Sequence, residues 1–455
     1  GTERGEPFDP ARAKQALQAT EWPKRAASPS WLQLIPQRDT LIRAAGQPAD
    51  MTLSSPGPTL GVVGGGQLGR MLAEAAAPLG VEVVVSDPTP DAPAAAIARD
   101  QVVGDFDDEA TIRELAERAD YLTFEIELAD PDLLERVAEE TDTPVHPRPE
   151  TLRTIEDKLV QKRRLEEAGV PVPEFRAVDS EDELRAALDD LGYPAMLKAR
   201  KGGYDGRGNV PVHAPEDVAE AFDEIVDAAQ GGGPDDPAGV AMVEEFVDYE
   251  RELAVMGCRG STRHGSDGAP EQATFPVTET IHREEILRET VAPARASEDV
   301  RERAREVALD VLDVMDGRGV YGIELFQTAD DEILLNEIAP RPHNSGHWTI
   351  EGCHTSQFEQ HVRAVTRRPL GVTDRGAPTV SANILGDVDE RQDATLRGEE
   401  AVFERARAHP HWYGKREVYR LRKMGHVTLV GRREADRDDL LADVRDLRNG
   451  LTFAE

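Results

Sequence analysis

Two acidic residues, Glu324 and Glu337, lie in apolar segments on either side of the turn TADDE, within the run IELFQTADDEILLNEIA. If these segments pair as a β-hairpin, both carboxylates can point to one face and hold a hard cation that bridges phosphates, as Mg²⁺ is usually bound. The alternative is a pair of edge-strand glutamates facing water, but unpartnered acids are unfavourable in such apolar surroundings. The pattern therefore predicts a metal–phosphate site.

A glycine-rich cationic segment, KARKGGYDGRGNV, runs from Lys198 to Val210. Backbone N–H groups and cationic side chains match phosphate oxygens, so such a segment can act as a flap that closes over a polyphosphate. It lacks the GxxxxGK(S/T) pattern of a Walker A loop, and a basic hairpin turn is the simpler alternative. In a chain this poor in basic residues we favour the flap.

A second glycine motif, GVVGGGQLGR at residues 61–70, has its glycines at 64, 66 and 69, with Asp87 further along. This G-x-G-x-x-G spacing occurs in dinucleotide-binding folds, where the following helix N-terminus binds a pyrophosphate. A tight strand-to-helix turn explains it equally well. Against a dinucleotide, prolines follow Asp87 where the next helix of a regular unit should begin, and we find no second cofactor-binding half.

Composition limits the partners and the compartment. The 455 residues include 88 Asp and Glu against 53 Lys and Arg, a formal net charge of −35, which argues against nucleic acid. No apolar run is long enough to span a membrane and no leader opens the chain, so we expect a cytoplasmic protein without a membrane partner. The two cysteines form no metal-ligand cluster. Acidic runs and only 8 lysines indicate a halophile-like proteome.

Strand and helix patterns alternate from Leu60 onward, which predicts an α/β fold. The strand LGVV precedes a helix over 67–79, and the strand VEVVVS, a helix after Asp107 and the strand YLTFE follow. We expect a disordered extension at 1–57, a Rossmann-like domain at 58–152, a larger domain at 153–368 and a C-terminal domain at 369–455. Met51 resembles a protein start, which leaves open whether residues 1–50 exist in the native protein.

These features together resemble the ATP-grasp superfamily, and within it the N5-carboxyaminoimidazole ribonucleotide synthase family of purine biosynthesis. The resemblance runs from Leu60 to Val430 and is carried by GGGQLGRML, TFEIE, DKLVQK, LKARKGGYDGRG, NEIAPRPHNSGHWT, SQFEQHVRA and YGKREVYRLRKMGH. It implies an ATP-grasp fold with an N-terminal Rossmann-like domain, a small β-rich C-terminal domain and a homodimer. It also implies that the first glycine loop faces a ribonucleotide substrate and binds no NAD.

By this resemblance, Gln67 and Leu68 contact aminoimidazole ribonucleotide, and Glu125 holds its ribose. The 5′-phosphate is held by Lys415, Arg422 and Lys423. The family usually reads Arg-Pro-Gly-Arg-Lys where this chain reads YRLRK at residues 419–423. Arg420 therefore either replaces the absent arginine or faces solvent.

The resemblance also implies an ATP site built from the flap, the segment MVEEFVDYERELAV and the glutamate hairpin. Its residues are Lys158, Lys198, Gly202, Gly203, Tyr204, Asp205, Gly206, Arg207, Gly208, Glu244, Glu245, Phe246, Val247, Glu252, His282, Asn336 and Glu337. Lys198 would meet the α- and β-phosphates and Glu252 the ribose hydroxyls. Glu324 and Glu337 would carry Mg²⁺, with Mn²⁺ as the alternative metal.

The implied reaction is an ATP-dependent carboxylation of 5-aminoimidazole ribonucleotide with bicarbonate. ATP phosphorylates bicarbonate to carboxyphosphate, and the exocyclic amine then takes up the carboxyl group to give the N5-carboxy product, ADP and phosphate. Arg341 and His347 are the candidates for the bicarbonate site, with Asn344 orienting the imidazole. We interpret His343 as structural and Trp348 as a packing residue.

Three other functions fit parts of the pattern. Formate-dependent glycinamide ribonucleotide transformylase shares the architecture, and biotin carboxylase is a more distant alternative. An ATP-grasp-like protein could also bind nucleotide as a regulator without turnover. GGYDGRG and HNSGHWT resemble the carboxylating family more closely, and no metal carboxylate or flap glycine is lost.

Overall fold

The computed structural model describes residues 55–202, 208–228, 239–262 and 269–453, which belong to one compact unit, Leu53–Glu455. Residues 1–54 of the expected extension and the centre of the expected flap, Gly203 to Arg207, lie outside the described residues. Within the described ranges, no helix combines the length and the apolar character that crossing a membrane requires.

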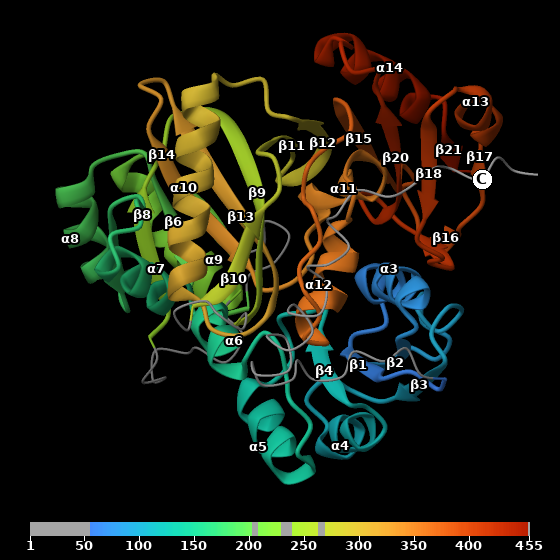
Figure 1. The fold of residues 1–455 in the computed structure, drawn as a ribbon. Coiled ribbons are helices and arrows are strands. Elements are labelled where there is room, and N and C mark those ends of the chain that lie inside the picture. The colour runs from blue at the N-terminus through green and yellow to red at the C-terminus, as the bar shows by residue number, and fades with distance from the viewer. Residues whose placement is uncertain (1–54, 203–207, 229–238, 263–268, 454–455) are drawn as a thin grey trace, which may run out of the picture. The chain divides into compact units, whose positions relative to one another are not determined.

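The first domain is a parallel sheet with strands in the order β3-β2-β1-β4 (Figure 1). The strands are β1 (Thr59–Val63), β2 (Glu82–Asp87), β3 (Asp100–Val103) and β4 (Tyr121–Phe124), and the helices are α3 (Gln67–Ala76), α4 (Glu109–Glu117) and α5 (Pro131–Thr141). The predicted strands LGVV, VEVVVS and YLTFE and the predicted helix after Asp107 correspond to β1, β2, β4 and α4, whereas β3 and α5 were not predicted. The helix expected over 67–79 ends as a 3-10 turn, η2 (Ala77–Leu79). Pro78 lacks the N–H that another α-helical turn would use.

A linking pair of helices leads to a small antiparallel sheet with strands in the order β5-β8-β6-β7. Its core packs the apolar faces of two helices on the sheet. The elements are α6 (Pro149–Glu156), α7 (Lys158–Glu167), β5 (Phe175–Val178), α8 (Glu181–Leu191), β6 (Ala195–Ala199), β7 (Asn209–Val212), η3 (Pro215–Asp217), α9 (Val218–Ala228) and β8 (Ala241–Glu245).

A long antiparallel sheet follows, in the order β14-β13-β9-β11-β12-β15-β20-β18, with β10 paired to β9. The helix α10 packs on β9 and β13 (Figure 1). The elements up to the last helix before the C-terminal domain are β9 (Tyr249–Thr262), β10 (Pro270–Thr274), β11 (Thr278–Arg283), β12 (Ile286–Ala292), α10 (Glu298–Val314), β13 (Gly319–Thr328), β14 (Ile333–Ala339), η4 (Asn344–Gly346), α11 (Thr349–Gly352) and α12 (Gln357–Val365).

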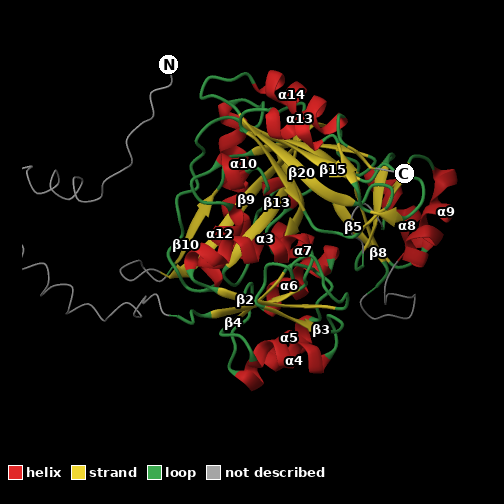
Figure 2. Cartoon of the chain, turned by 90° about the vertical axis from the view of Figure 1, so that its right-hand side faces the viewer, coloured by secondary structure: helices red, strands yellow, loops and turns green. Residues whose placement is uncertain are grey.

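The C-terminal strands continue this sheet, because β15 pairs with β12 from Glu289 to Ala292. In Figure 2, β9, β13, β15 and β20 run alongside one another. The two parts expected at 153–368 and 369–455 therefore share one sheet. The elements are β15 (Thr379–Leu385), β16 (Gln392–Asp393), β17 (Leu396–Arg397), α13 (Glu399–Glu404), β18 (Ala408–Trp412), β19 (Glu417–Val418), β20 (Lys423–Val430), α14 (Arg437–Asn449) and β21 (Thr452–Phe453).

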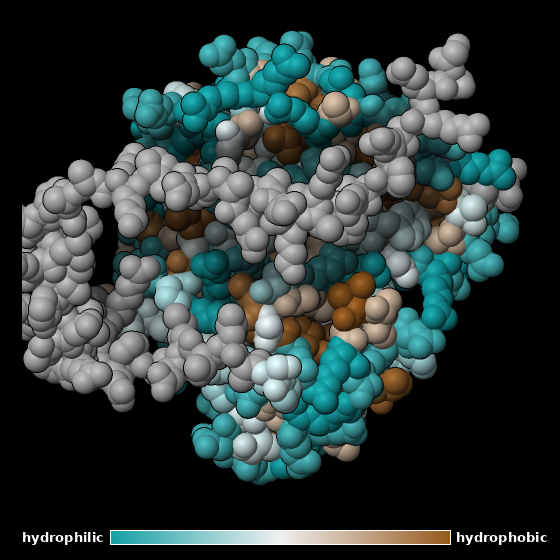
Figure 3. Space-filling view, turned by 45° about the vertical axis from the view of Figure 1, so that its right-hand side comes forward, coloured by the Kyte–Doolittle hydropathy of each residue, from teal (hydrophilic) through white to brown (hydrophobic). Residues whose placement is uncertain are grey.

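The surface has a testable electrostatic consequence. Hydrophilic side chains cover most of the coloured surface in Figure 3, and the chain carries a net charge of −35. The range of charge repulsion falls from about 10 Å at 0.1 M salt to about 3 Å at 1 M. We therefore expect the thermal unfolding midpoint to rise by several degrees between roughly 0.1 M and 2 M KCl. An equal or lower midpoint in concentrated salt would refute the expected halophilic adaptation.

Candidate active site

The glycine loop between β1 and α3 binds a carboxylate of the chain itself. Glu125, which follows β4, accepts hydrogen bonds from the backbone N–H of Gly66 and, at 2.7 Å, of Gly69. A side chain at Gly64 would collide with Glu125, and Gly64 also has a φ of +105°, which favours glycine. Glu125 thus occupies the N-terminus of α3, where dinucleotide-binding folds place a pyrophosphate. This contact accounts for the motif without NAD.

Glu125 gives the first domain a pH-dependent stability. Burial raises the pKa of Glu125 to about 7, although the two N–H donors act in the opposite direction. Between its ordinary pKa and 7 the folded state holds the extra proton, so stability from this group decreases as pH rises through that window. The free energy of unfolding of the wild type, relative to Glu125→Gln, should fall by about 1.4 kcal/mol per unit of pKa shift. Denaturant titrations at pH 5 and 8 measure it. If the difference in unfolding free energy between wild type and Glu125→Gln were the same at both pH values, the raised pKa of Glu125 would be contradicted. Glu74→Gln, which changes an exposed carboxylate of the same domain, is the control.

A lysine of the C-terminal domain reaches the same loop. Lys415 Nζ donates to Gln67 Oε1 at 2.9 Å and to the carbonyl oxygen of Lys423 at 2.7 Å. The structure thus brings together three of the residues predicted for the ribonucleotide. Leu68 is only 7 % exposed and packs in the core of the first domain.

The segment that departs from the family pattern keeps a left-handed turn. Leu421, at the position where the family has glycine, has a φ of +66°. Arg420 has a largely exposed side chain and forms an ion pair with Glu284 at 2.7 Å. Arg422 donates to the carbonyl oxygen of Glu417 at 2.7 Å and lies 5.0 Å from the centre of the Tyr419 ring.

At the other end of the site, three charged residues form a buried cluster. Glu244 on β8 forms ion pairs with Lys198 on β6 and with Lys162 on α7, the latter at 3.2 Å. Burial by itself raises the pKa of Glu244, but the two lysines bring it down to about 2, and burial lowers the pKa of Lys162 to about 8. Lys162 also donates to the carbonyl oxygen of Leu335 at 2.9 Å, which ties the small sheet's cluster to β14.

The hairpin predicted around the turn TADDE is formed by β13 and β14. Glu324 on β13 and Glu337 on β14 lie directly opposite each other, and a β-bulge follows in which Asn336 is the unpaired extra residue. Bulges re-aim side chains and recur beside active sites. Lys158, the first residue of α7, meets Glu337 Oε1 at 2.9 Å and lowers its pKa, whereas burial raises the pKa of Glu324 to about 7.

The other described residues predicted for ATP lie on β9 and β11, on β8 and the loop after it, and at the two ends of the expected flap. His282 Nδ1 lies 2.8 Å from Glu252 Oε2, and Glu252 raises the pKa of His282 against the effect of burial. Glu245 accepts the N–H of Glu174 at 3.0 Å. The strand β8 ends at Glu245, so Phe246, which is 42 % exposed, and Val247 lie in the loop that follows. Gly202 and Gly208, at the two ends of the expected flap, have positive φ angles.

Among the residues predicted for bicarbonate, only Arg341 faces this region in the described part of the chain. Its guanidinium meets Glu127 at 2.8 Å. His347 is 1 % exposed, packs 5.0 Å from His426, and is a neutral ring because burial lowers its pKa far below the ordinary value. Its Nδ1 is held by Gln357 at 3.1 Å, and Asn344 has no hydrogen bond to it among the described residues. Direct contact of His347 with bicarbonate, and its orientation by Asn344, are therefore not supported.

Comparison with known proteins agrees with this arrangement. Residues 58–156 match the ribonucleotide synthetase preATP-grasp domain, 163–358 the ATP-grasp domain, and 379–439 the phosphoribosylaminoimidazole carboxylase C-terminal domain. The chain is 40 % identical over 381 residues to the N5-carboxyaminoimidazole ribonucleotide synthase of Brucella melitensis, covering 84 % of this chain and 98 % of that protein. The chain belongs to the N5-carboxyaminoimidazole ribonucleotide synthase family.

Solved structures of this synthase family share the fold. The Thermotoga maritima synthetase superposes with a TM-score of 0.75 at 38 % identity, covering 88 % of this chain and 100 % of that one. The Aspergillus clavatus synthase, solved in complex with ADP and 5-aminoimidazole ribonucleotide, has a TM-score of 0.75 at 32 % identity, covering 87 % and 100 %. The predicted ATP-grasp architecture is thereby confirmed.

Three further residues lie among these side chains of the candidate site and were not predicted from the sequence. Lys162 lies one helical turn from Lys158, so their shared face of α7 was a usable signal. Glu127, which pairs with Arg341, lies two residues after Glu125. His343 Nδ1 lies 3.5 Å from Glu324 Oε1 and 2.8 Å from Ser345 Oγ, so the imidazole interpreted as structural is the one beside the glutamate hairpin. Arg341 and His343 are separated by one residue, and side chains at this spacing share a face wherever the backbone is extended.

Replacement of Lys415 tests the ribonucleotide end of the synthase-family site. Lys415→Met removes a cation beside Gln67, and a charge-assisted hydrogen bond is worth about 1.5–3 kcal/mol. We expect the KM for the ribonucleotide to rise by roughly 10- to 100-fold with a smaller change in kcat. Steady-state kinetics measure both. Arg416→Met is the matched control, since that neighbour is 72 % exposed and pairs only at the surface with Asp91 in the described structure. Equal effects of the two variants would contradict the assignment.

Proposed function

We propose that this chain catalyses the ATP-dependent carboxylation of 5-aminoimidazole ribonucleotide with bicarbonate, giving N5-carboxyaminoimidazole ribonucleotide, ADP and phosphate. The observation that carries the proposal is that two clusters of charged side chains, one at the glycine loop and one at the glutamate hairpin, are connected in one site. One joins Glu125 and Lys415 at the glycine loop, and the other joins Lys158, Lys198 and the glutamate pair at the hairpin. Lys423 connects them: its backbone binds Lys415, and its charge affects the pKa of Glu324 and His343.

The ribonucleotide would lie between the first and last domains. Glu125 can accept hydrogen bonds from ribose hydroxyls with the lone pairs that the loop N–H groups leave free. Lys415, Arg422 and Lys423 supply the positive charge for the 5′-phosphate. This arrangement orients the exocyclic amine toward the hairpin, where the carboxyl group must be delivered.

ATP would lie against the small sheet, with Lys158 and Lys198 at its phosphates. Both lysines are paired with glutamates, so each is held in place before ATP binds. Glu252 and His282 form the hydrogen-bonded pair assigned to the nucleoside end. The flap assignments Gly203, Tyr204, Asp205, Gly206 and Arg207 remain predictions that lie outside the described residues.

The glutamate pair fits Mg²⁺. Glu324 Oε1 is buried without a hydrogen-bond partner in the described structure, and Glu337 lies opposite it on the next strand. No cluster of three or more His, Cys, Asp or Glu could hold a metal within the described ranges, so the protein would offer two carboxylates and leave the other positions to phosphate and water, as is usual for Mg²⁺. When bound, Mg²⁺ would stabilise negative charge on the phosphate oxygens.

Arg341 and His343 are the side chains best placed for bicarbonate. Arg341 is a fixed cation because Glu127 holds its guanidinium, and it can stabilise an anionic oxygen of bicarbonate and of carboxyphosphate. His343 is neutral, since burial lowers its pKa well below the ordinary value, and it can exchange a hydrogen bond with either species. The bicarbonate oxygen attacks the γ-phosphorus with ADP as leaving group, and the amine then displaces phosphate from the carboxyl carbon.

A comparison of acceptors tests this function against the transformylase alternative. Phosphate release from ATP and Mg²⁺ should require bicarbonate and aminoimidazole ribonucleotide. Release only with formate and glycinamide ribonucleotide would assign the chain to the transformylase reaction, and no release in any mixture would favour a nucleotide-binding regulator. The homodimer and the cytoplasmic location stay predictions, and sedimentation of the purified chain tests the first.

A further inference from the structure

A small polar cavity lies behind the PRPHNSGHW segment, where η4 meets β12 and β20. Its volume is about 10 Å³, and Thr290, Asn344, His347 and His426 are among the residues that line it. These four side chains are 3 %, 8 %, 1 % and 1 % exposed, so each is more than nine-tenths buried. The cavity lies outside the two substrate clusters described above.

Each of the four side chains presents a buried polar atom that has no hydrogen-bond partner within the described part of the chain. The atoms are Thr290 Oγ1, both polar atoms of the Asn344 amide, His347 Nε2 and His426 Nε2. Leaving one buried polar group unsatisfied costs about 1–3 kcal/mol, and native proteins keep few of them. Five such atoms on one cavity indicate a shared polar ligand.

The hydrogen bonds around His347 decide what this ligand must accept. Gln357 Oε1 accepts the N–H of His343 at 3.0 Å, which fixes its amide orientation, and Gln357 Nε2 donates to His347 Nδ1 at 3.1 Å. With Nδ1 as acceptor, the neutral ring carries its proton on Nε2. His347 therefore offers a donor to the cavity, and Asn344 Oδ1 and Thr290 Oγ1 offer acceptors.

We propose that this cavity binds one ordered water molecule, which accepts from His347 Nε2–H and is shared with His426, Asn344 and Thr290. Its volume matches the roughly 10–15 Å³ that a single water needs, and a buried water typically makes about three hydrogen bonds. The water joins η4 to β12 and β20. Through Gln357 it fixes the backbone of His343, and through His426, whose Nδ1 lies 2.9 Å from the Tyr413 hydroxyl, it reaches the strand region next to Lys415.

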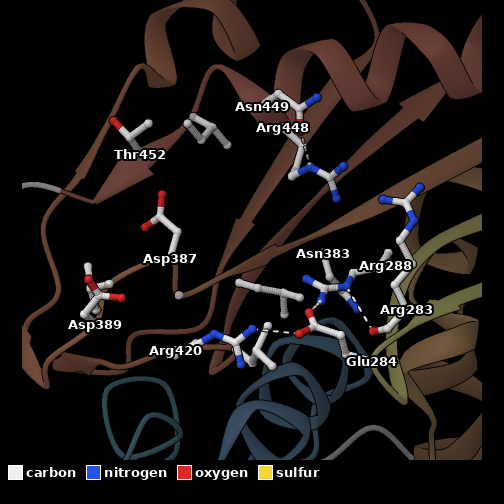
Figure 4. Close-up of a pocket in the computed structure, with 15 residues that line it drawn as sticks. Arg283, Glu284, Arg288, Asn383, Asp387, Asp389, Arg420, Arg448, Asn449 and Thr452 are labelled. Atoms are coloured by element: carbon white, nitrogen blue, oxygen red, sulfur yellow. Dashed lines mark hydrogen bonds and ion pairs between the residues drawn. The ribbon is translucent and has the colours of Figure 1, made fainter.

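The larger pocket in Figure 4 supplies the neighbouring solvent. It has a volume of about 410 Å³, and Arg288 and Asn383 line both it and the inner cavity, so they form the wall through which the water exchanges. This outer pocket is no anion site by itself, because Arg288 and Arg420 are paired with Glu284 and Arg448 with Glu289. Its role in the proposal is solvent access.

A crystal structure of the full chain at a resolution that shows ordered solvent tests the proposal directly. We expect one solvent peak within hydrogen-bond distance of His347 Nε2 and of at least two of the other three side chains. No peak, direct pairing of the side chains with one another, or density for an ion would overturn it.

Replacement of Thr290 gives an independent test in solution, because the thermal unfolding midpoint should fall if the cavity holds water but not if the cavity is dry. If water is bound, Thr290→Val removes one of its partners and lowers the thermal midpoint, as Thr428→Val should by losing its bond to Ser381 at 2.8 Å. If the cavity is dry, Thr290→Val removes an unsatisfied hydroxyl, and the midpoint stays unchanged or rises. An unchanged or higher midpoint for Thr290→Val, alongside a lower one for Thr428→Val, would therefore refute the water.

Discussion

Glu337→Gln is expected to lower kcat by roughly 100- to 1,000-fold while leaving the fold intact, the range found when one preorganised electrostatic contact to the reacting group is removed. Glu337 faces Glu324 across the hairpin and pairs with Lys158. The substitution would therefore remove one of the two carboxylates proposed to hold the metal and release the lysine proposed to bind phosphate. Its side chain is half exposed and the amide is isosteric, so stability should change little.

Steady-state kinetics at saturating Mg²⁺ and ATP, with circular dichroism as the check on folding, measure this effect. Glu332→Gln is the matched control, since Glu332 is an exposed carboxylate in the turn of the same hairpin. The control should keep full activity. A kcat of the Glu337→Gln enzyme within a few-fold of the wild-type value would contradict the proposed role of Glu337 in metal binding.

Glu244→Gln should be the most destabilising of the substitutions considered. It leaves Lys162, 2 % exposed, and Lys198, 8 % exposed, with no carboxylate between them. Removing one partner of a buried ion pair costs about 3–5 kcal/mol, because the remaining charge stays buried and uncompensated. We therefore expect a loss of this order in the free energy of unfolding at pH 7, measured by denaturant titration.

The pH dependence of that loss gives a second check. The pKa of Glu244 is lowered to about 2, so its contribution is complete above the ordinary glutamate pKa and disappears as the pH falls toward 2. The difference between wild type and variant should shrink in the same range. Glu181→Gln, which breaks an exposed pair with Arg185, should lose less than about 1 kcal/mol. Comparable losses for the two variants would contradict the buried cluster.

The local sequence pattern was sufficient to predict the helices and strands whose apolar residues recur with a clear period. The apolar strands around TADDE predicted the hairpin and two carboxylates on one face, because a short turn between two strands restricts the register. The direct opposition of Glu324 and Glu337 was found only in the structure. The helix after the glycine loop was equally clear, and its end was misjudged by one turn because Pro78 is compatible with a 3-10 turn.

Contacts between distant segments could not be read from local pattern. The glycine spacing was ambiguous because the group that fills the loop, Glu125, lies 56 residues after Gly69. His343 and His347 lie in one short segment, and which of them lies beside Glu324 depends on the turn η4 and on the packing of His347 against β20. The sharing of one sheet by the last two domains likewise depends on a pairing between β12 and β15 across many residues.

The proposed function depends on activation of bicarbonate by phosphoryl transfer from ATP. The most direct measurement uses bicarbonate labelled with oxygen-18, together with ATP, Mg²⁺ and aminoimidazole ribonucleotide, and mass analysis of the phosphate before the label exchanges with water. We expect one oxygen-18 atom in each phosphate formed, because the attacking oxygen of bicarbonate leaves with phosphorus when the amine takes the carboxyl group. Phosphate whose new oxygen comes from water would contradict it.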